Sequence, residues 1–567
     1  MRASRTSQRV RRTPAVYASA TLCLAVAALA ALAPSCLRDR EARDPRTPRD
    51  VEVPEYLKDT VGEVARFTGR ESVAVQGYGF VTGLDGTGTK VVPPGVRQQI
   101  LDMMRRNKVE HAEEILADPD TAVVMVSGWL TPGIGKGELF DLDVQAIPRT
   151  DTTSLDGGFL LECDLTRVKL ARGVESRSEP LALGRGSIFV SPFGSQGKSK
   201  TSGDPRVGRI LAGGKALKTR HFRLALLTPS SRTADQIVRL VNARFPNAAS
   251  GAEDPGRIDL AIPRGFRDDK THFLDLVGAT YMRETLDARD RRVALLLETL
   301  EAGNDMDRVA LCLEAFGPTV APQLYDLGEH PSDAVRFHVG RTLAHLQDAR
   351  AVHVLERIAT DDRSRFQEQA VEALGTLQSG IGLGVLGRTL NAANARVRVA
   401  AWRQMDRLAP RTFLAREFAD KFTLSIVTTQ GGPFVYVART LKPQIAVFGN
   451  VAVRPPILAE TRRVTATALE NEDQLKLISR RRSRDLHIEA TLDVKDLVEK
   501  LALPFGVSET QPKIQGLDLG YSDVVGLLHE MSRKGALTGP IVLQPLEYRI
   551  PSDRETTRPI SAAEETP

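Results

Sequence analysis

The sequence predicts an α+β multidomain protein with strand-rich N-terminal domains, an α-solenoid in the middle and a C-terminal α/β region. Three observations lead to this prediction. The chain has 567 residues, which is more than one hydrophobic core normally organises. Short runs of apolar or alternating residues recur on both sides of the middle region, and such runs are typical of strands. The middle region instead repeats a helical pattern at a fixed period, which is typical of a solenoid.

The N-terminus predicts export. Five arginines and no acidic residue precede an apolar run at residues 16–33, and this order is typical of a secretory signal peptide. We therefore expect residues 1–35 to be a signal peptide and the charged, proline-containing residues 36–52 to be a linker. An uncleaved membrane anchor is the alternative, because the apolar run approaches the roughly 20 residues that span a bilayer.

The apolar run ends in LAPSC (residues 32–36), which resembles a bacterial lipoprotein signal. This resemblance implies that Cys36 becomes the lipidated first residue, anchored at the outer membrane. The alternative is an ordinary export signal in which Cys36 has no special role.

The basic character of the chain is concentrated in this leader. The whole sequence carries 77 basic and 71 acidic residues, a formal charge of +6. Residues 1–35 account for five arginines, which leaves 72 basic residues against 71 acidic ones. The charge therefore supports no nucleic-acid partner.

Two strand-rich domains are expected at residues 53–204 and 205–282. In the first, residues 122–130 form a short apolar run, and residues 140–146 alternate between apolar and polar side chains. The second has the pattern of a strand–helix–strand unit. Its three elements are expected at residues 221–227, 234–245 and 257–262.

Residues 283–420 contain the repeat. Similar helical segments begin at Asp333, Ser364 and Ala395, so both steps are 31 residues long. A two-helix unit at this period buries its apolar stripe only against its neighbours, and it resembles short HEAT-type repeats. We expect a concave surface that binds a protein partner of unknown identity. Strand patterns return in the α/β region at residues 421–550, and the polar residues 551–567 are expected to form a disordered tail.

The glycine-rich segment at residues 77–88 lacks the pattern of a phosphate-binding loop. A phosphate-binding loop needs Gly-Lys-Ser/Thr at the start of a helix, but here Thr89 separates Gly88 from Lys90 and prolines follow. The glycine spacing of dinucleotide-binding folds is absent as well. We interpret the segment as turns that need positive φ angles and close backbone packing.

Two further candidate sites have simpler explanations. His338 and His345 share a predicted helix face, but a metal site would need a third convergent ligand, so helix packing or solvation is favoured. Asp141 and Asp143 lie on one side of a predicted strand, as catalytic carboxylates would, but solvent-facing residues of an alternating strand have the same pattern. The sequence therefore predicts neither an enzyme nor a cofactor or metal site.

One basic cluster lies in the C-terminal region, at Arg480, Arg481, Arg482 and Arg484. It has no interleaved aromatic residues for stacking on bases, so a solvated turn is the favoured interpretation. Contact with an anionic envelope polymer or a partner protein is the alternative.

The glycine-rich segment GYGFVTGLDGTG (residues 77–88) resembles the start of the bacterial flagellar P-ring protein. Other stretches follow in the order of that family, so the resemblance covers residues 56–280. The motif residues are Gly77, Tyr78, Gly79, Gly83, Asp85, Gly86 and Gly88. The other stretches are residues 122–147, 153–161, 182–190, 208–215 and 233–245.

The resemblance implies a structural role. Members of the family are exported, bind no cofactor and catalyse nothing; many copies form a periplasmic ring around the flagellar rod, at the peptidoglycan layer and beside an outer-membrane ring. On this basis residues 205–282 would form the ring, and the expected partners are further copies, rod proteins, outer-membrane ring proteins and peptidoglycan. The solenoid and the C-terminal region depart from the family pattern. The alternative is therefore a non-flagellar envelope lipoprotein or adaptor that uses the same fold and its repeats to bind a protein or cell-wall partner.

Overall fold

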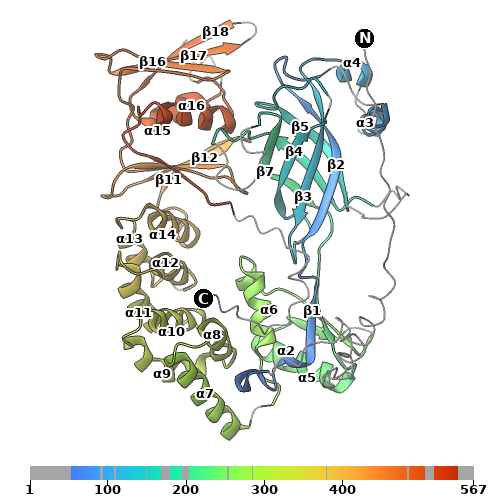
Figure 1. The fold of residues 1–567 in the computed structure, drawn as a ribbon, viewed down its shortest axis with the longest axis vertical. Helices are drawn as coiled ribbons and strands as arrows, with labels where there is room; N and C mark the ends of the chain where they lie inside the picture. Colours follow the sequence, from blue (N-terminus) through green and yellow to red (C-terminus); the bar gives the residue numbers. More distant parts are fainter. Residues whose placement is uncertain are drawn as a thin grey trace, which may run out of the picture. The chain divides into compact units, whose positions relative to one another are not determined.

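The computed structural model describes residues 53–546, apart from short gaps at residues 90–93, 107–109, 149, 168–178, 194–203, 252–253, 284, 379, 482–483 and 505–515. The predicted signal peptide, the linker with Cys36, and the C-terminal tail lie outside the described residues. The mixed α+β architecture is as predicted (Figure 1). Among the described helices, none combines the length and apolar character that a bilayer span requires.

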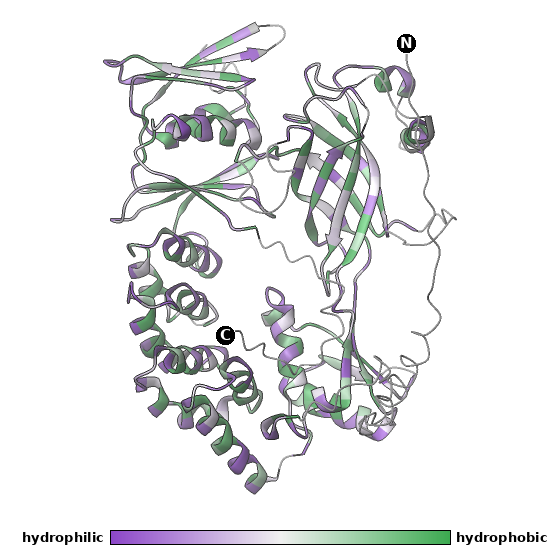
Figure 2. Cartoon of the chain, in the orientation of Figure 1, coloured by the Kyte–Doolittle hydropathy of each residue, from purple (hydrophilic) through white to green (hydrophobic). Residues whose placement is uncertain are grey.

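Six strands close into a barrel in the order β2-β3-β4-β7-β6-β5. The expected alternation appears on β4, where Phe140, Leu142, Val144 and Ala146 are buried in the barrel core. Figure 2 shows both hydrophilic and hydrophobic residues along the barrel strands, as one exposed and one buried face require. The strands are β2 (Val73–Thr82), β3 (Ala122–Leu130), β4 (Leu139–Ala146), β5 (Phe159–Arg167), β6 (Ala182–Ser187) and β7 (Val207–Ala216), and two helices, α3 (Pro94–Arg106) and α4 (Ala112–Leu116), join β2 to β3.

A separate four-stranded sheet has the order β1-β8-β10-β9. Ile237 and Val241 of α5 and Phe273 of α6 complete its core, and the Ser230 hydroxyl caps α5 by accepting from the Thr233 N–H. The expected boundary at residue 205 does not separate this sheet from the barrel. Strand β1 lies before residue 205 but belongs to the four-stranded sheet, and β7 lies after it but belongs to the barrel. The elements are α2 (Val61–Val64), β1 (Ala65–Thr68), β8 (Phe222–Leu226), α5 (Ser231–Arg244), β9 (Ala249–Gly251), β10 (Arg257–Leu260) and α6 (Lys270–Gly278).

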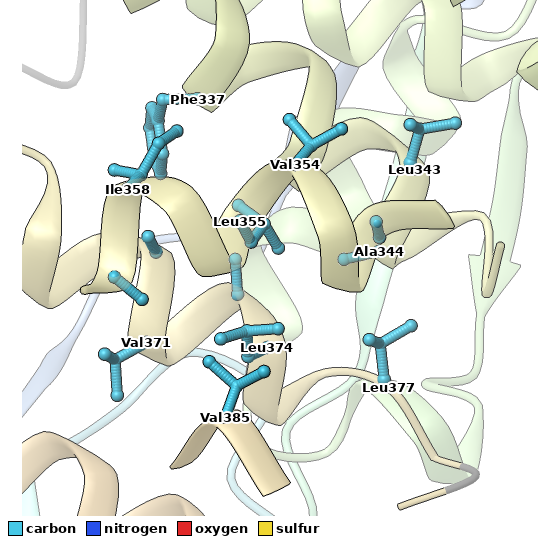
Figure 3. Close-up of a cluster of buried hydrophobic side chains, with 14 of the residues drawn as sticks. Phe337, Leu343, Ala344, Val354, Leu355, Ile358, Val371, Leu374, Leu377 and Val385 are labelled. Carbon is cyan, nitrogen blue, oxygen red and sulfur yellow. The ribbon is translucent and has the colours of Figure 1, made fainter. Parts of the chain in front are cut away.

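Successive helices stack to form the solenoid. Leu355 of α11 lies among Leu343, Leu374 and Val385 from the neighbouring helices, and all four are buried (Figure 3). Each helix thus covers its apolar stripe with those next to it, as the repeat pattern predicts. The helices are α7 (Leu286–Glu301), α8 (Met306–Ala315), α9 (Ala321–Leu324), α10 (Asp333–His345), α11 (Arg350–Ala359), α12 (Gln367–Gly375), α13 (Leu383–Thr389) and α14 (Ala395–Leu408).

The C-terminal region has two sheets, with orders β11-β12-β14-β13-β19 and β15-β16-β17-β18. Both sheets share one apolar core with two helices, which contribute Leu497 and Leu528. Figure 1 shows these helices between the two sheets. The elements are β11 (Leu414–Phe418), β12 (Phe422–Val427), β13 (Phe434–Val437), β14 (Gln444–Phe448), β15 (Ile457–Glu460), β16 (Val464–Ala468), β17 (Gln474–Arg481), β18 (Arg484–Thr491), α15 (Val494–Ala502), α16 (Tyr521–Arg533) and β19 (Ile541–Leu543).

Candidate functional site: the glycine-rich turn and its arginine contacts

The first glycines of the motif lie inside strand β2, where neighbouring strands come too close for a side chain. A Cβ atom on Gly77 would lie 2.2 Å from the carbonyl oxygen of Asp164 on β5. A Cβ atom on Gly79 would lie 2.5 Å from a methyl carbon of Leu160. Between them, Tyr78 is half-buried and packs against the barrel core. Glycine at these two positions therefore permits the close approach of β2 and β5.

The last glycines form a tight turn after β2. Gly83, Asp85 and Gly86 have φ angles of 78°, 49° and 82°, in the left-handed region that glycine occupies without steric cost. A Cβ atom on Gly88 would lie 2.0 Å from the carbonyl oxygen of Thr121. The segment is thus a turn held by backbone packing.

Two arginines from the C-terminal region hold this turn. Arg462 and Arg463 lie between strands β15 and β16, and Arg463 Nη2 is 2.8 Å from Asp85 Oδ2. Arg463 also donates to the Gly83 carbonyl at 3.1 Å, and Arg462 donates to the Leu84 carbonyl at 2.8 Å. The guanidinium groups therefore bind both the side chain and the backbone of the turn.

A buried carboxylate lies on the other side of Arg463. Asp523, in the first turn of α16, is only 5% exposed, and its Oδ2 lies 3.5 Å from Arg463 Nη1. Burial raises the pKa of Asp523 to about 6; the Arg463 charge opposes this shift and the Asp156 charge adds to it. Asp156 in turn accepts a hydrogen bond from Ser522 at 2.7 Å. We call Asp85, Asp156, Arg462, Arg463 and Asp523 the arginine clamp.

The arginine clamp positions the turn through charge-assisted hydrogen bonds and ion pairs. Its carboxylates face guanidinium groups or a hydroxyl, and these contacts join the barrel to the C-terminal region. The clamp has no sequence signature, because its members are separated by up to several hundred residues. Asp85 stands out only as part of the glycine-rich motif, and the adjacent Arg462 and Arg463 have a pattern that is common in surface loops.

The candidate carboxylate pair is also engaged in structural contacts. Asp141 accepts the backbone N–H groups of Ala212 and Leu441, each at 2.8 Å. Burial raises the pKa of Asp141, and these two hydrogen bonds oppose the rise. Asp143 pairs with Arg209 at 2.9 Å. Both carboxylates therefore hold neighbouring segments in place.

The basic cluster lies at the end of the hairpin formed by β17 and β18. Arg480 pairs with Glu460 at 2.8 Å, and both side chains are exposed. Arg481 and Arg484 are opposite each other in the strand register, while Arg482 lies outside the described residues. A hairpin end is compatible with both interpretations of this cluster, the solvated turn and the anionic contact.

The histidines that share a helix face have different surroundings. His338 is buried next to Arg341, and burial together with that charge lowers its pKa to about 4. His345 instead meets His272 and Glu314, which come from two other helices. This group was not predictable from the sequence, because His272, Glu314 and His345 have no regular spacing.

The glycine-rich turn belongs to a region with known relatives. Residues 60–293 match the family model described as flagellar P-ring protein. This region is therefore similar to flagellar P-ring proteins. The match confirms the resemblance seen in the sequence and supports a P-ring-like structural role. A second family model, HEAT repeats, matches residues 293–375 and confirms the nature of the solenoid.

Individual P-ring proteins cover different shares of the chain. The flagellar P-ring protein of Caulobacter vibrioides is 32% identical over 225 residues, which are 38% of this chain and 58% of that protein. Flagellar P-ring protein 1 of Chromobacterium violaceum is 33% identical over 31% of this chain and 48% of its own length. The chain thus spans about half the length of these two relatives. The P-ring protein of Syntrophotalea carbinolica is 24% identical over 59% of this chain and 86% of its own length.

Proposed function

We propose that this protein is a structural subunit that assembles with further copies of itself into a periplasmic ring around the flagellar rod. The observation that carries the proposal is the P-ring match over residues 60–293, which includes the whole glycine-rich turn. The arginine clamp and the contacts of Asp141 and Asp143 support the proposal, because these charged side chains hold segments of the fold together. No catalytic role follows from them.

The four-stranded sheet supports a ring contact. Its outer strands within the described residues are β1 (Ala65–Thr68) and β9 (Ala249–Gly251), so each has one edge without a partner strand in that sheet. Two different edges on one subunit allow a head-to-tail contact, and such contacts close into rings when the rotation between subunits permits. We therefore place the ring contact in residues 205–282 together with β1.

The solenoid is the part that would meet a component other than the ring. Ion pairs join its successive units at the surface, including Arg357 with Glu329 and Arg388 with Glu356. These exposed pairs recur from one unit to the next and give this face of the solenoid a regular pattern of charges, which suits a protein partner. Rod proteins, outer-membrane ring proteins and peptidoglycan are the other expected neighbours of the ring.

Deletion of the gene tests the flagellar role. We expect basal bodies purified from the deletion strain to lack the periplasmic ring in negative-stain micrographs, and motility to fall. The intact gene should restore both, whereas a variant with Gly88→Ala should not. Unchanged rings in the deletion strain would contradict the proposal.

The HEAT match favours a second candidate, a non-flagellar envelope lipoprotein or adaptor. Residues 293–375 lie at and beyond the end of the P-ring match, so the repeats are an addition to that domain. On this alternative the deletion strain stays motile and the protein fractionates away from basal bodies. Mass spectrometry of the mature N-terminus would then show whether Cys36 carries lipid.

A further inference from the structure

Two histidines and a buried glutamate meet where α6 packs against the first helices of the solenoid. His272 is in the first turn of α6, Glu314 is near the end of α8, and His345 is the last residue of α10. The Glu314 side chain is 5% exposed, and each histidine side chain is 18% exposed. We call these three residues the His–Glu–His cluster.

The polar atoms of the cluster converge on one point. His272 Nε2 lies 3.0 Å from Glu314 Oε1, and His345 Nδ1 lies 3.3 Å from Glu314 Oε2. The two ring nitrogens are 2.6 Å apart. The imidazole planes are inclined at 75°, so the rings approach the common point from different directions.

Hydrogen bonds alone cannot satisfy all three contacts while Glu314 is ionised. If both ring nitrogens carry protons and donate to the carboxylate, two N–H groups face each other across 2.6 Å. If one nitrogen is unprotonated, it can accept from the other ring, but its own lone pair then faces a carboxylate oxygen. A cation removes this conflict, because it accepts a lone pair from all three atoms at once.

We propose that His272, Glu314 and His345 bind one zinc ion. Two imidazoles and one carboxylate form a known three-ligand set for zinc, whereas magnesium and calcium prefer oxygen ligands throughout. Tetrahedral zinc with bonds of about 2.1 Å separates its ligand atoms by about 3.4 Å. The observed separations of 2.6 to 3.3 Å are slightly smaller, so small side-chain rotations would admit the ion.

The surroundings of the cluster leave room for a fourth zinc ligand, and the nearby arginine side chains are paired with other groups. The cluster lines a cavity of about 510 Å³, from which water or an oxygen ligand can complete the coordination. Arg341 lies nearby but pairs with Asp307 at 2.8 Å, and Arg244 donates to the Ala315 carbonyl at 2.6 Å. Bound zinc would fasten the P-ring-like region to the solenoid, since its ligands come from both.

Zinc binding to the full exported chain tests the proposal. After removal of metal with a chelator, isothermal titration with zinc chloride should give one ion per chain, and zinc should raise the melting temperature. Cobalt in place of zinc should give the visible absorption of a four-coordinate nitrogen/oxygen site. His345→Gln and Glu314→Gln should each weaken zinc binding at least tenfold.

His353→Gln is the matched control, because His353 is an exposed solenoid histidine, 74% exposed and 3.6 Å from Glu329. This variant should bind zinc as the unaltered chain does. Circular dichroism of each variant shows whether it is folded, and His345→Gln keeps the test valid if Glu314→Gln does not fold. Two results would overturn the proposal: a folded unaltered chain that binds no zinc, or a folded His345→Gln chain that binds it equally well.

Discussion

The barrel and the solenoid bury their apolar residues by opposite routes. In the barrel, Val75 of β2 pairs with Gly128 of β3 and with Arg167 of β5, so its neighbours come from distant parts of the sequence. In the solenoid, Leu355 meets side chains from the helices just before and after its own. A barrel closes only when all of its strands are in register, whereas a solenoid is stabilised repeat by repeat. A destabilising substitution should therefore loosen all strands of the barrel, whereas in the solenoid it should loosen only the neighbouring helices.

The largest effect is expected from a cavity in the solenoid. Leu355→Ala removes a side chain that is 0% exposed, and such truncations cost about 2–5 kcal/mol of stability. Hydrogen exchange measured by mass spectrometry should show faster exchange in α10–α12 and unchanged exchange in β2–β7. Equal loss of protection in the barrel would show that the two regions unfold as one unit.

Adding one methyl group inside the barrel should lower its stability by a similar amount. Gly77→Ala places a Cβ 2.2 Å from a backbone oxygen, so β2 and β5 must separate, at a cost of about 3 kcal/mol. Here faster exchange should extend over all six strands. Gly387→Ala in α13 is the matched control, because nothing lies within 4 Å of its Cβ position and alanine favours the helix by about 1 kcal/mol. If both variants were equally stable in urea, the close approach of β2 and β5 would be refuted.

Loss of Arg463 tests the contact between the glycine-rich turn and the C-terminal region. Arg463→Ala leaves the buried Asp523 without its cation, which should cost about 2–3 kcal/mol, somewhat less than for a fully buried pair. The free energy of unfolding in urea measures this cost. Arg480→Ala is the control, since its exposed pair with Glu460 contributes about 0.5 kcal/mol. Equal stability of the two variants would contradict the role of Arg463 in stabilising the fold through Asp523.

The pH dependence of stability should carry a smaller contribution from Asp523. Its folded pKa of about 6 exceeds the ordinary value of 3.8, so the folded state binds the proton more tightly. The contribution of Asp523 to the free energy of unfolding is therefore highest at low pH. It falls as the pH rises from about 4 to 6, by at most about 3 kcal/mol. Urea unfolding at pH 4.5 and 7.5 should show a drop that Asp523→Asn reduces, and an identical drop in both proteins would contradict the assignment.

The sequence could predict whatever depends on local pattern. The 31-residue period identified the solenoid, because each repeat packs on its neighbours in the chain. The alternation at Phe140–Ala146 predicted a strand, which the structure places in the barrel. The pairing of β1 with β8 was not predictable, since the register between distant strands leaves no local signal. For the same reason Asp85 was noticed only as part of a motif. Its partner Arg463 lies in another region of the chain.

Electron cryotomography of flagellar motors in intact cells tests the central claim most directly. A compact protein fused to the C-terminus of the chain would add density to subtomogram averages. If the P-ring-like region builds the ring, this density should encircle the rod at the peptidoglycan layer, in register with the ring subunits. Motors that show no added density, in cells where the fusion protein is present in the envelope, would contradict a flagellar role.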